Sequence, residues 1–271
     1  MGIDYVLCCD NADQEQLLKY NHGVPADKIV VLNTPVEELT KMSAIAWIRD
    51  KIAKEIMPQG QWSIWIDDNV SDFTCLPNPL MFGNKIDYFN DQLTVSGEPV
   101  SWREAFKHVA TKDEFARVLE NTITEAEDHG TIFAGFAIET NPMFRCNKWQ
   151  RFGYARTQFA LYKNDGSSWY PKEFRGGTCV FEDMYKSIDV VCRYGSIVIN
   201  RYAKPLKIPF EAGGIGTFKE REPFLIKNCQ TLMKMYPGLL SFVRDTDYQV
   251  TFAKRSINTV NIWRRENGFC D

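Results

Sequence analysis

The chain has 271 residues, of which 44% are hydrophobic and 25% charged, so it can bury a large core and does not belong to the disordered class. No run approaches the roughly 18 consecutive apolar residues of a membrane span, and the first residues lack a signal-peptide pattern, so we expect no membrane partner and a cytoplasmic location. The net charge of −3 conceals a division: residues 1–143 hold 11 Lys and Arg against 23 Asp and Glu, and residues 144–271 hold 21 against 12. The basic part indicates either a polyanion-binding surface or solvated helix faces.

Short apolar runs alternate with segments of helical periodicity along the chain. The expected strands span 5–9, 28–33, 62–66, 132–138, 159–162 and 196–200, and the expected helices 12–20, 44–57, 102–109, 113–128 and 181–194. Strands that alternate with helices predict an α/β fold with a mostly parallel central sheet flanked by helices. We expect a single domain over 1–271, with 74–130 as a helical insertion and 217–271 as a C-terminal extension.

The strongest local signal is the apolar segment 62–66, which ends abruptly in Asp67, Asp68 and Asn69. Ligands of open α/β sheets gather at the carboxyl ends of strands, and Mg²⁺ or Mn²⁺ takes one or two carboxylates together with substrate phosphates. The pattern therefore suits a metal-diphosphate site. It also suits an Asp-rich turn in which Asp68 or Asn69 caps the following segment.

A second acidic pair, Glu182 and Asp183, follows Gly176 and Gly177 and opens a predicted helix. A carboxylate in this position can act as a general base that removes the proton from an acceptor hydroxyl. The alternative is that both residues are ordinary partners of the helix dipole.

Four segments together carry a family resemblance: 47–50 (Trp-Ile-Arg-Asp), 65–70 (Trp-Ile-Asp-Asp-Asn-Val), 181–184 (Phe-Glu-Asp-Met) and 200–202 (Asn-Arg-Tyr). In this order they resemble the TET/JBP-associated glycosyltransferases, a DNA-modifying group of the GT-A class. The resemblance implies a GT-A-like fold and a metal-dependent enzyme. It also implies transfer of a sugar from a nucleotide sugar, expected to be a UDP-sugar, to the hydroxyl of a hydroxymethylated pyrimidine in DNA. The natural setting would be phage DNA hypermodification in the host cytoplasm.

The resemblance also implies roles for individual residues. Asp183 would be the catalytic base and Glu182 would orient the acceptor, while Asp68 and Asn69 would hold Mn²⁺ or Mg²⁺. The expected nucleotide-sugar contacts on this basis are Asp10, Arg49 and Asp67. Separately from the resemblance, the glycine loop at Gly213 and Gly214 can bring backbone N–H groups close to the donor phosphates. Three alternatives stay open: Arg49 braces the acidic cluster, Arg49 forms a surface ion pair with Asp50 or Glu55, and the glycine loop is an ordinary turn. The family motif usually ends in aspartate, and the amide of Asn69 is a weaker ligand.

Cations and aromatic residues interleave over 144–156, a composition that can hold phosphates and stack on an exposed base. The expected DNA or acceptor contacts are Arg145, Lys148, Trp149, Arg151, Arg156 and Arg201. Cations that lie over a core of aromatic residues would give the same composition without DNA. The rival functions are a GT-A transferase that acts on a glycan, protein or small molecule, and a binding module that has kept the fold but lost turnover.

Overall fold

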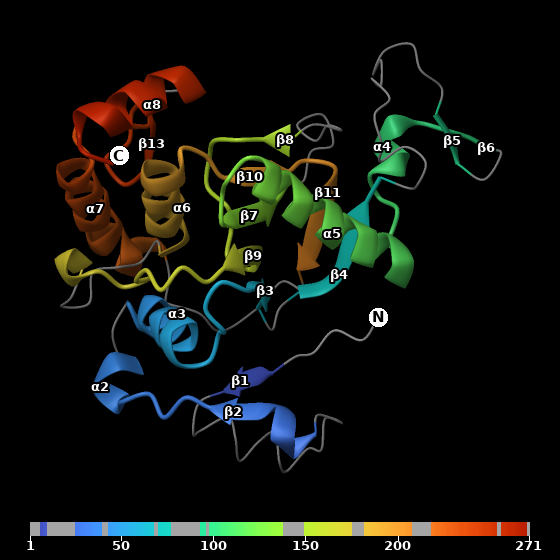
Figure 1. Ribbon diagram of the computed structural model, residues 1–271, viewed down its shortest axis with the longest axis horizontal. Helices are drawn as coiled ribbons and strands as arrows, with labels where there is room; N and C mark the ends of the chain where they lie inside the picture. Colours follow the sequence, from blue (N-terminus) through green and yellow to red (C-terminus); the bar gives the residue numbers. More distant parts are fainter. Residues whose placement is uncertain are drawn as a thin grey trace.

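A computed structural model describes residues 6–9, 25–39, 43–67, 70–76, 93–95, 98–137, 149–174, 182–207, 218–253 and 256–269 (Figure 1). At its centre lies a five-stranded sheet in the order β3-β9-β7-β10-β8. These strands are β3 (Trp62–Ile66), β7 (Phe133–Phe136), β8 (Trp149–Gln150), β9 (Phe159–Lys163) and β10 (Val198–Asn200). The fold is therefore a mixed α/β fold.

The expectation of a mostly parallel sheet is wrong. In the central sheet only β7 and β10 pair in parallel, because β9 lies antiparallel between β3 and β7, and β8 runs antiparallel along β10. The sequence pattern does not predict the direction of a strand, because a strand buried on both faces is an apolar run in either orientation. The strands β3, β7 and β10 nevertheless share one direction, so their carboxyl ends meet at one edge of the sheet.

Apolar side chains fill both faces of this sheet, with the period of two that strands impose. In β9, Phe159 and Leu161 face one core cluster, while Ala160 and Tyr162 face the other. The helix α5 (Lys112–Asp128) packs on the first of these faces. The helices α3 (Ala44–Glu55) and α6 (Glu182–Tyr194) pack on the second.

Further short strands form two-stranded sheets around this centre. They are β1 (Leu7–Cys9) with β2 (Ile29–Val31), β4 (Val70–Cys75) with β11 (Ala203–Lys207), β5 (Leu93–Val95) with β6 (Glu98–Val100), and β12 (Leu240–Phe242) with β13 (Val250–Phe252). The remaining helices are α2 (Val36–Leu39), α4 (Trp102–Ala105), α7 (Phe218–Met235) and α8 (Ile257–Glu266), with 3-10 turns at Ala26–Lys28 and Lys172–Phe174. The expected helix at 12–20 lies outside the described residues, and the helix expected at 102–109 ends at Ala105.

The C-terminal elements α7, β12, β13 and α8 pack against α6 and the core behind it. From α8, the guanidinium of Arg264 donates from Nε to the Cys192 carbonyl at 2.7 Å and from Nη2 to the Arg193 carbonyl at 2.5 Å. These carbonyls belong to the last turn of α6, where a cation is favoured by the helix dipole. The segment therefore stabilises the C-terminal end of α6.

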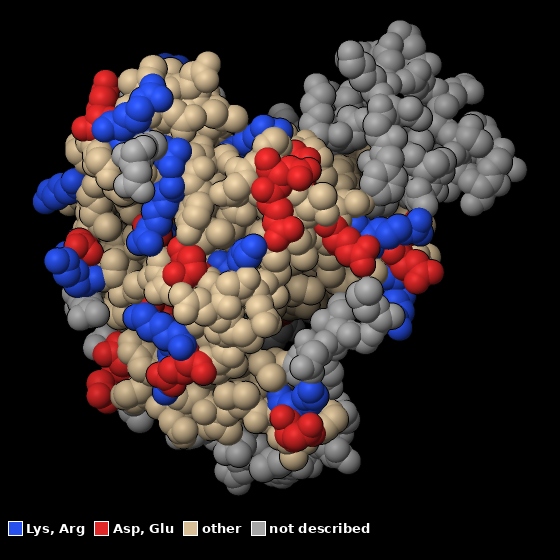
Figure 2. All heavy atoms as spheres, viewed as in Figure 1, with Lys and Arg blue, Asp and Glu red and all other residues tan. Residues whose placement is uncertain are grey.

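Charges are distributed unevenly over the surface. On the face seen in Figure 2, acidic side chains gather over α5, while basic ones lie over α6 and α8. The exposed acids of α5 are Asp113, Glu120, Glu127 and Asp128. The uneven charge of the two halves of the sequence is thus carried by different elements of the fold. Among the described helices, none is both long and apolar enough to cross a lipid bilayer.

Candidate functional site

The shared carboxyl edge of β3, β7 and β10 gathers most of the predicted site residues that the structure describes. Asp67 follows β3 directly, and its backbone N–H donates to the Gln158 carbonyl, just before β9, at 2.9 Å. The first residues of α6, Glu182 and Asp183, lie at the same edge, because Glu182 shares a cation with Asp67. The two acidic segments that the sequence places far apart therefore meet.

The joining cation is Arg49, on the buried face of α3, where its side chain is 7% exposed. Its guanidinium donates from Nη2 to Asp67 Oδ1 and from Nη1 to the Thr157 carbonyl, both at 3.0 Å. Its Nε lies 3.3 Å from Glu182 Oε1. A planar fork with five N–H donors is the side chain best suited to hold several acceptors at once. Of the alternatives left open for Arg49, the structure shows the one that braces the acidic cluster.

Glu182 is almost fully buried, and its surroundings shift its ionisation. Burial raises the pKa of this carboxyl, the neighbouring Asp183 charge raises it further, and the Arg49 guanidinium lowers it only in part, so the pKa is about 7. Besides Arg49, the hydroxyl of Thr157 donates to Glu182 Oε1 at 3.3 Å. A carboxyl with a pKa near neutrality is able to exchange a proton under physiological conditions.

Asp183 faces a different cation. Its Oδ2 accepts from Arg156 Nη1 at 3.1 Å, and its Oδ1 accepts from the Met184 backbone N–H at 2.7 Å. The Asp183 side chain is 12% exposed and that of Arg156 is 39% exposed, so the pair lies at the boundary between core and solvent. Each carboxylate oxygen can accept a further hydrogen bond, so Asp183 keeps the capacity to bind a hydroxyl.

The backbone around Arg156 is fixed from two sides. The Ala155 N–H donates to Ser187 Oγ at 3.0 Å, and that hydroxyl donates to the Asp183 carbonyl at 2.7 Å. From the sheet, Gly135 in β7 approaches so closely that a Cβ added there would lie 2.6 Å from the Ala155 Cβ. Residues 155–157 are therefore held between β7 and α6, with Arg156 against Asp183 and Thr157 against Glu182.

Other predicted contacts pair with residues outside the Arg49 cluster. Arg151 Nη2 pairs with Glu125 on α5 at 3.4 Å, while Nη1 of Arg201 donates to Gln150 Oε1 at 2.5 Å. The Trp149 ring packs edge-on against Tyr202, with centroids 5.1 Å apart. The structure thus brings Arg156 to the acidic cluster but pairs Arg151 with another helix. The predicted residues Asp10, Asp68, Asn69, Arg145, Lys148, Gly213 and Gly214 lie outside the described residues.

Sequence reasoning missed three side chains, of which two lie at this site and the third, Lys186, lies beside it on α6. Thr157 and Ser187 hold the acidic cluster, and nothing in the sequence around a single Thr or Ser signals such a contact. Lys186 lies in the middle of α6, where every residue from Glu182 to Cys192 is buried. The position of Lys186 close to the large apolar residues Tyr185 and Ile188 of the same helix is a sequence signal that indicates a buried charge.

The described residues contain no cluster of three or more His, Cys, Asp or Glu arranged to hold a metal ion. Asp67 and Glu182 are both engaged by Arg49, so a cation at this edge would depend on Asp68 and Asn69. Carboxylate and amide oxygens are the donors that Mg²⁺ and Mn²⁺ take, so this segment fits such an ion chemically. Comparisons of the chain with protein-family models, curated proteins and solved structures find no match.

Proposed function

We propose that the chain is a GT-A-like glycosyltransferase that moves a sugar from a nucleotide sugar to the hydroxyl of a hydroxymethylated pyrimidine in DNA. The observation that supports it most is the shared guanidinium of Arg49, which joins the acidic end of β3 to the carboxyl pair that opens α6. The donor site must lie beside the group that accepts the proton, because the acceptor hydroxyl has to reach the sugar and the base at the same time.

In the proposed reaction, Asp183 is the general base. The acceptor oxygen forms a bond to the anomeric carbon of the sugar, and the bond from that carbon to the donor phosphate oxygen breaks. The acceptor proton passes to the Asp183 carboxylate, and the nucleoside diphosphate leaves with the bonding electrons. Asp183 suits this role because, of the two carboxylates that open α6, it is the one paired with a half-exposed partner.

Glu182 and Arg49 support this chemistry without contacting the reacting atoms. Glu182 points to the buried cation and to Thr157, so it fixes the first turn of α6 against α3 and β9. Arg49 holds Asp67, which we assign to the donor nucleotide. Such prearranged charges cost no reorganisation when the sugar is transferred.

The proposed enzyme uses Mn²⁺ or Mg²⁺, held by Asp68 and Asn69. Bound there, the ion would neutralise charge that develops on the departing diphosphate. The DNA acceptor is supported by the resemblance and by Arg156, whose half-exposed guanidinium lies beside the proposed base and is able to meet a phosphate. The pairing of Arg151 with Glu125 reduces the support from the 144–156 segment.

The test is to incubate the protein with Mn²⁺ or Mg²⁺, a panel of nucleotide sugars, and DNA that carries hydroxymethylcytosine or hydroxymethyluracil. The digested nucleosides are then weighed by mass spectrometry. We expect a mass increase of one sugar that is abolished by Asp183→Asn and by Asp67→Asn. The matched control is Asp113→Asn, an exposed aspartate in the first turn of α5, which should keep wild-type turnover.

The possible results distinguish an error in the proposed acceptor from an error in the proposed reaction. Sugar transfer to a glycan, a protein or a small alcohol but not to DNA would retain the transferase and replace the acceptor. Binding of nucleotide sugar or DNA without turnover in any combination would refute the enzyme and favour a binding module. Full activity of Asp183→Asn would refute the assignment of the base.

A further inference from the structure

The buried lysine of α6 is the most unusual charge outside the candidate site. Lys186 is 0% exposed, and its ammonium lies over the rings of Tyr162 and Trp169, 4.7 and 5.2 Å from their centroids. Its Nζ donates to Ser167 Oγ at 2.5 Å and lies 3.9 Å from Asp165 Oδ1. A buried cation costs folding free energy unless it is fully paired, so the groups that surround Lys186 are the place to look for its role.

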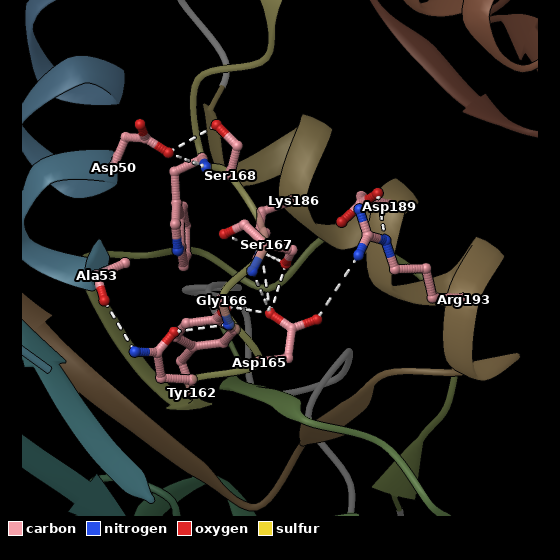
Figure 3. Close-up of polar contacts among 12 residues, drawn as sticks. Asp50, Ala53, Tyr162, Asp165, Gly166, Ser167, Ser168, Lys186, Asp189 and Arg193 are labelled. Carbon is pink, nitrogen blue, oxygen red and sulfur yellow. Dashed lines mark hydrogen bonds and ion pairs between the residues drawn. The ribbon is translucent and has the colours of Figure 1, made fainter. Parts of the chain in front are cut away.

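Lys186 connects α6 to the loop 164–170, which follows β9 (Figure 3). Asp165 Oδ1 accepts from Ser167 Oγ at 2.5 Å, from the Ser167 N–H at 3.0 Å and from Tyr162 Oη at 2.6 Å. The loop is therefore closed on itself around one carboxylate, with the ammonium of α6 beside it.

The other side of the same loop is bound to α3. Asp50 Oδ1 accepts from Ser168 Oγ at 2.6 Å and from the Trp169 N–H at 2.7 Å. Asn164 Nδ2 donates to the carbonyls of Ala53 and Met57, at 2.8 and 2.9 Å, at the C-terminal end of α3. Asp50 is the sequence neighbour of Arg49, so the loop fixes the turn of α3 that carries the cation of the candidate site.

We propose that Lys186 is a positioning residue, which through the loop 164–170 sets Arg49 on α3 against Glu182 and Asp183 on α6. It lies one helical turn after Glu182, and hydrogen bonds lead from it to α3 through residues of the loop. The effect of Lys186 on catalysis rests on the proposed function. Its effect on the position of Arg49 relative to Glu182 is independent of that function.

The charges that surround the ammonium come from three elements. Asp189 and Arg193 lie on α6, Asp165 in the loop and Asp50 on α3. Burial lowers the pKa of Lys186 to about 8, although Asp189 and Asp165 oppose that shift. For Asp165, burial acts to raise the pKa, but Lys186, Ser167 and Tyr162 together hold it at about 2. The ion pair is thus formed at neutral pH, and its loss would leave the buried Asp165 carboxylate with Arg193, 3.9 Å from its Oδ2, as the remaining cation beside it among the described residues.

The experiment compares Lys186→Met with Lys163→Met, the same substitution at a surface lysine of β9 that pairs with Glu127. Steady-state transfer by the full chain, assayed well below the unfolding temperature, should show kcat reduced about 10- to 100-fold in Lys186→Met, because a misplacement near 1 Å has that effect. The KM for nucleotide sugar should rise as well, because Arg49 holds Asp67, which we assign to the donor nucleotide. Lys163→Met should match the wild type in both constants.

A second readout needs no turnover. The Nε–H of Arg49 is buried against Glu182, so its exchange with solvent, followed by ¹⁵N NMR, should be slow in the wild type and in Lys163→Met. In Lys186→Met we expect exchange at least about 10-fold faster, while amides of the buried strand β9 keep their protection. This result is obtained even if no sugar is transferred, so failure of the proposed function is distinguished from failure of the positioning role.

Two further variants cover the case in which Lys186→Met does not fold. Ser167→Ala removes the hydroxyl between Lys186 and Asp165 but leaves both charges, and should cause the same changes to a smaller degree. Asp50→Asn weakens the connection at α3, and combining it with Ser167→Ala should lower kcat no further than the stronger single variant. Wild-type kcat and wild-type Arg49 exchange in folded Lys186→Met, or in Ser167→Ala, would overturn the proposal.

Discussion

Replacing Arg49 by methionine is expected to destabilise the protein strongly, and more strongly at alkaline than at acidic pH. The guanidinium makes two hydrogen bonds of 3.0 Å and one ion pair of 3.3 Å, at 7% side-chain exposure. A hydrogen bond to a charged group contributes about 1.5–3 kcal/mol. Removing one partner of a buried ion pair costs about 3–5 kcal/mol, because the remaining charge is left uncompensated. We therefore expect Arg49→Met to lower the free energy of unfolding by about 3–5 kcal/mol at pH 8.

The pH dependence follows from Glu182. Its pKa is raised in the folded protein, so its favourable contribution is present below the ordinary carboxyl range and is lost as the pH rises toward about 7. Without Arg49 the folded pKa of Glu182 rises further, because the cation that lowered it is gone. The variant then loses more stability than the wild type between pH 5 and pH 8. At pH 5 the protonated carboxyl needs no cation, so the deficit should be smaller.

Urea unfolding followed by circular dichroism at pH 5 and pH 8 measures both quantities. The matched control is Arg117→Met, at an exposed position on α5 where Nε bonds a carbonyl of the same helix at 3.3 Å; it should change stability by less than about 0.5 kcal/mol. The double variant Arg49→Met/Glu182→Gln should recover part of the loss, because the uncompensated carboxylate is removed with its partner. A deficit below about 1 kcal/mol, or one equal at both pH values, would refute the reasoning.

Three further predictions concern the elements around the site. Gly135→Ala should destabilise the protein by about 1–3 kcal/mol and reduce activity, because the new Cβ would lie 2.6 Å from the Ala155 Cβ and 3.0 Å from its Cα, and neither atom can move away by a side-chain rotation. Thermal unfolding and the transfer assay measure these effects. Thr111→Ala removes the hydroxyl that accepts from the Glu114 N–H in the capping box of α5 and should cost about 1 kcal/mol in urea unfolding. For Glu114, burial acts to raise the pKa, but the Thr111 N–H and His108 outweigh it and hold it at about 2, so the stability it contributes at neutral pH is lost as the pH falls from about 4.5 toward 2. Glu114→Gln should flatten that acid-induced loss, and an unchanged acid unfolding curve would contradict the assignment.

Much of the secondary structure could be predicted from the sequence, because each element carries its own local signal. The apolar run before Asp67 is β3, the helical periodicity over 113–128 corresponds to α5, and the acidic pair Glu182 and Asp183 begins α6. These signals depend on neighbours within a few positions, which the chain fixes wherever the element lies in the fold. The short strands of the second half, such as β11, lack such a pattern and were missed.

The sequence by itself determined that one acidic segment ends an apolar strand and that another begins a helix, and it identified Arg49 as a candidate partner. Only the tertiary structure decided that β9 runs antiparallel between β3 and β7 and that Arg49 joins Asp67 to Glu182. It also decided that Arg151, an expected DNA contact, pairs with Glu125. The physical reason is distance: periodicity and capping act over a few residues, whereas an ion pair depends on atoms brought within about 4 Å by packing of the whole chain.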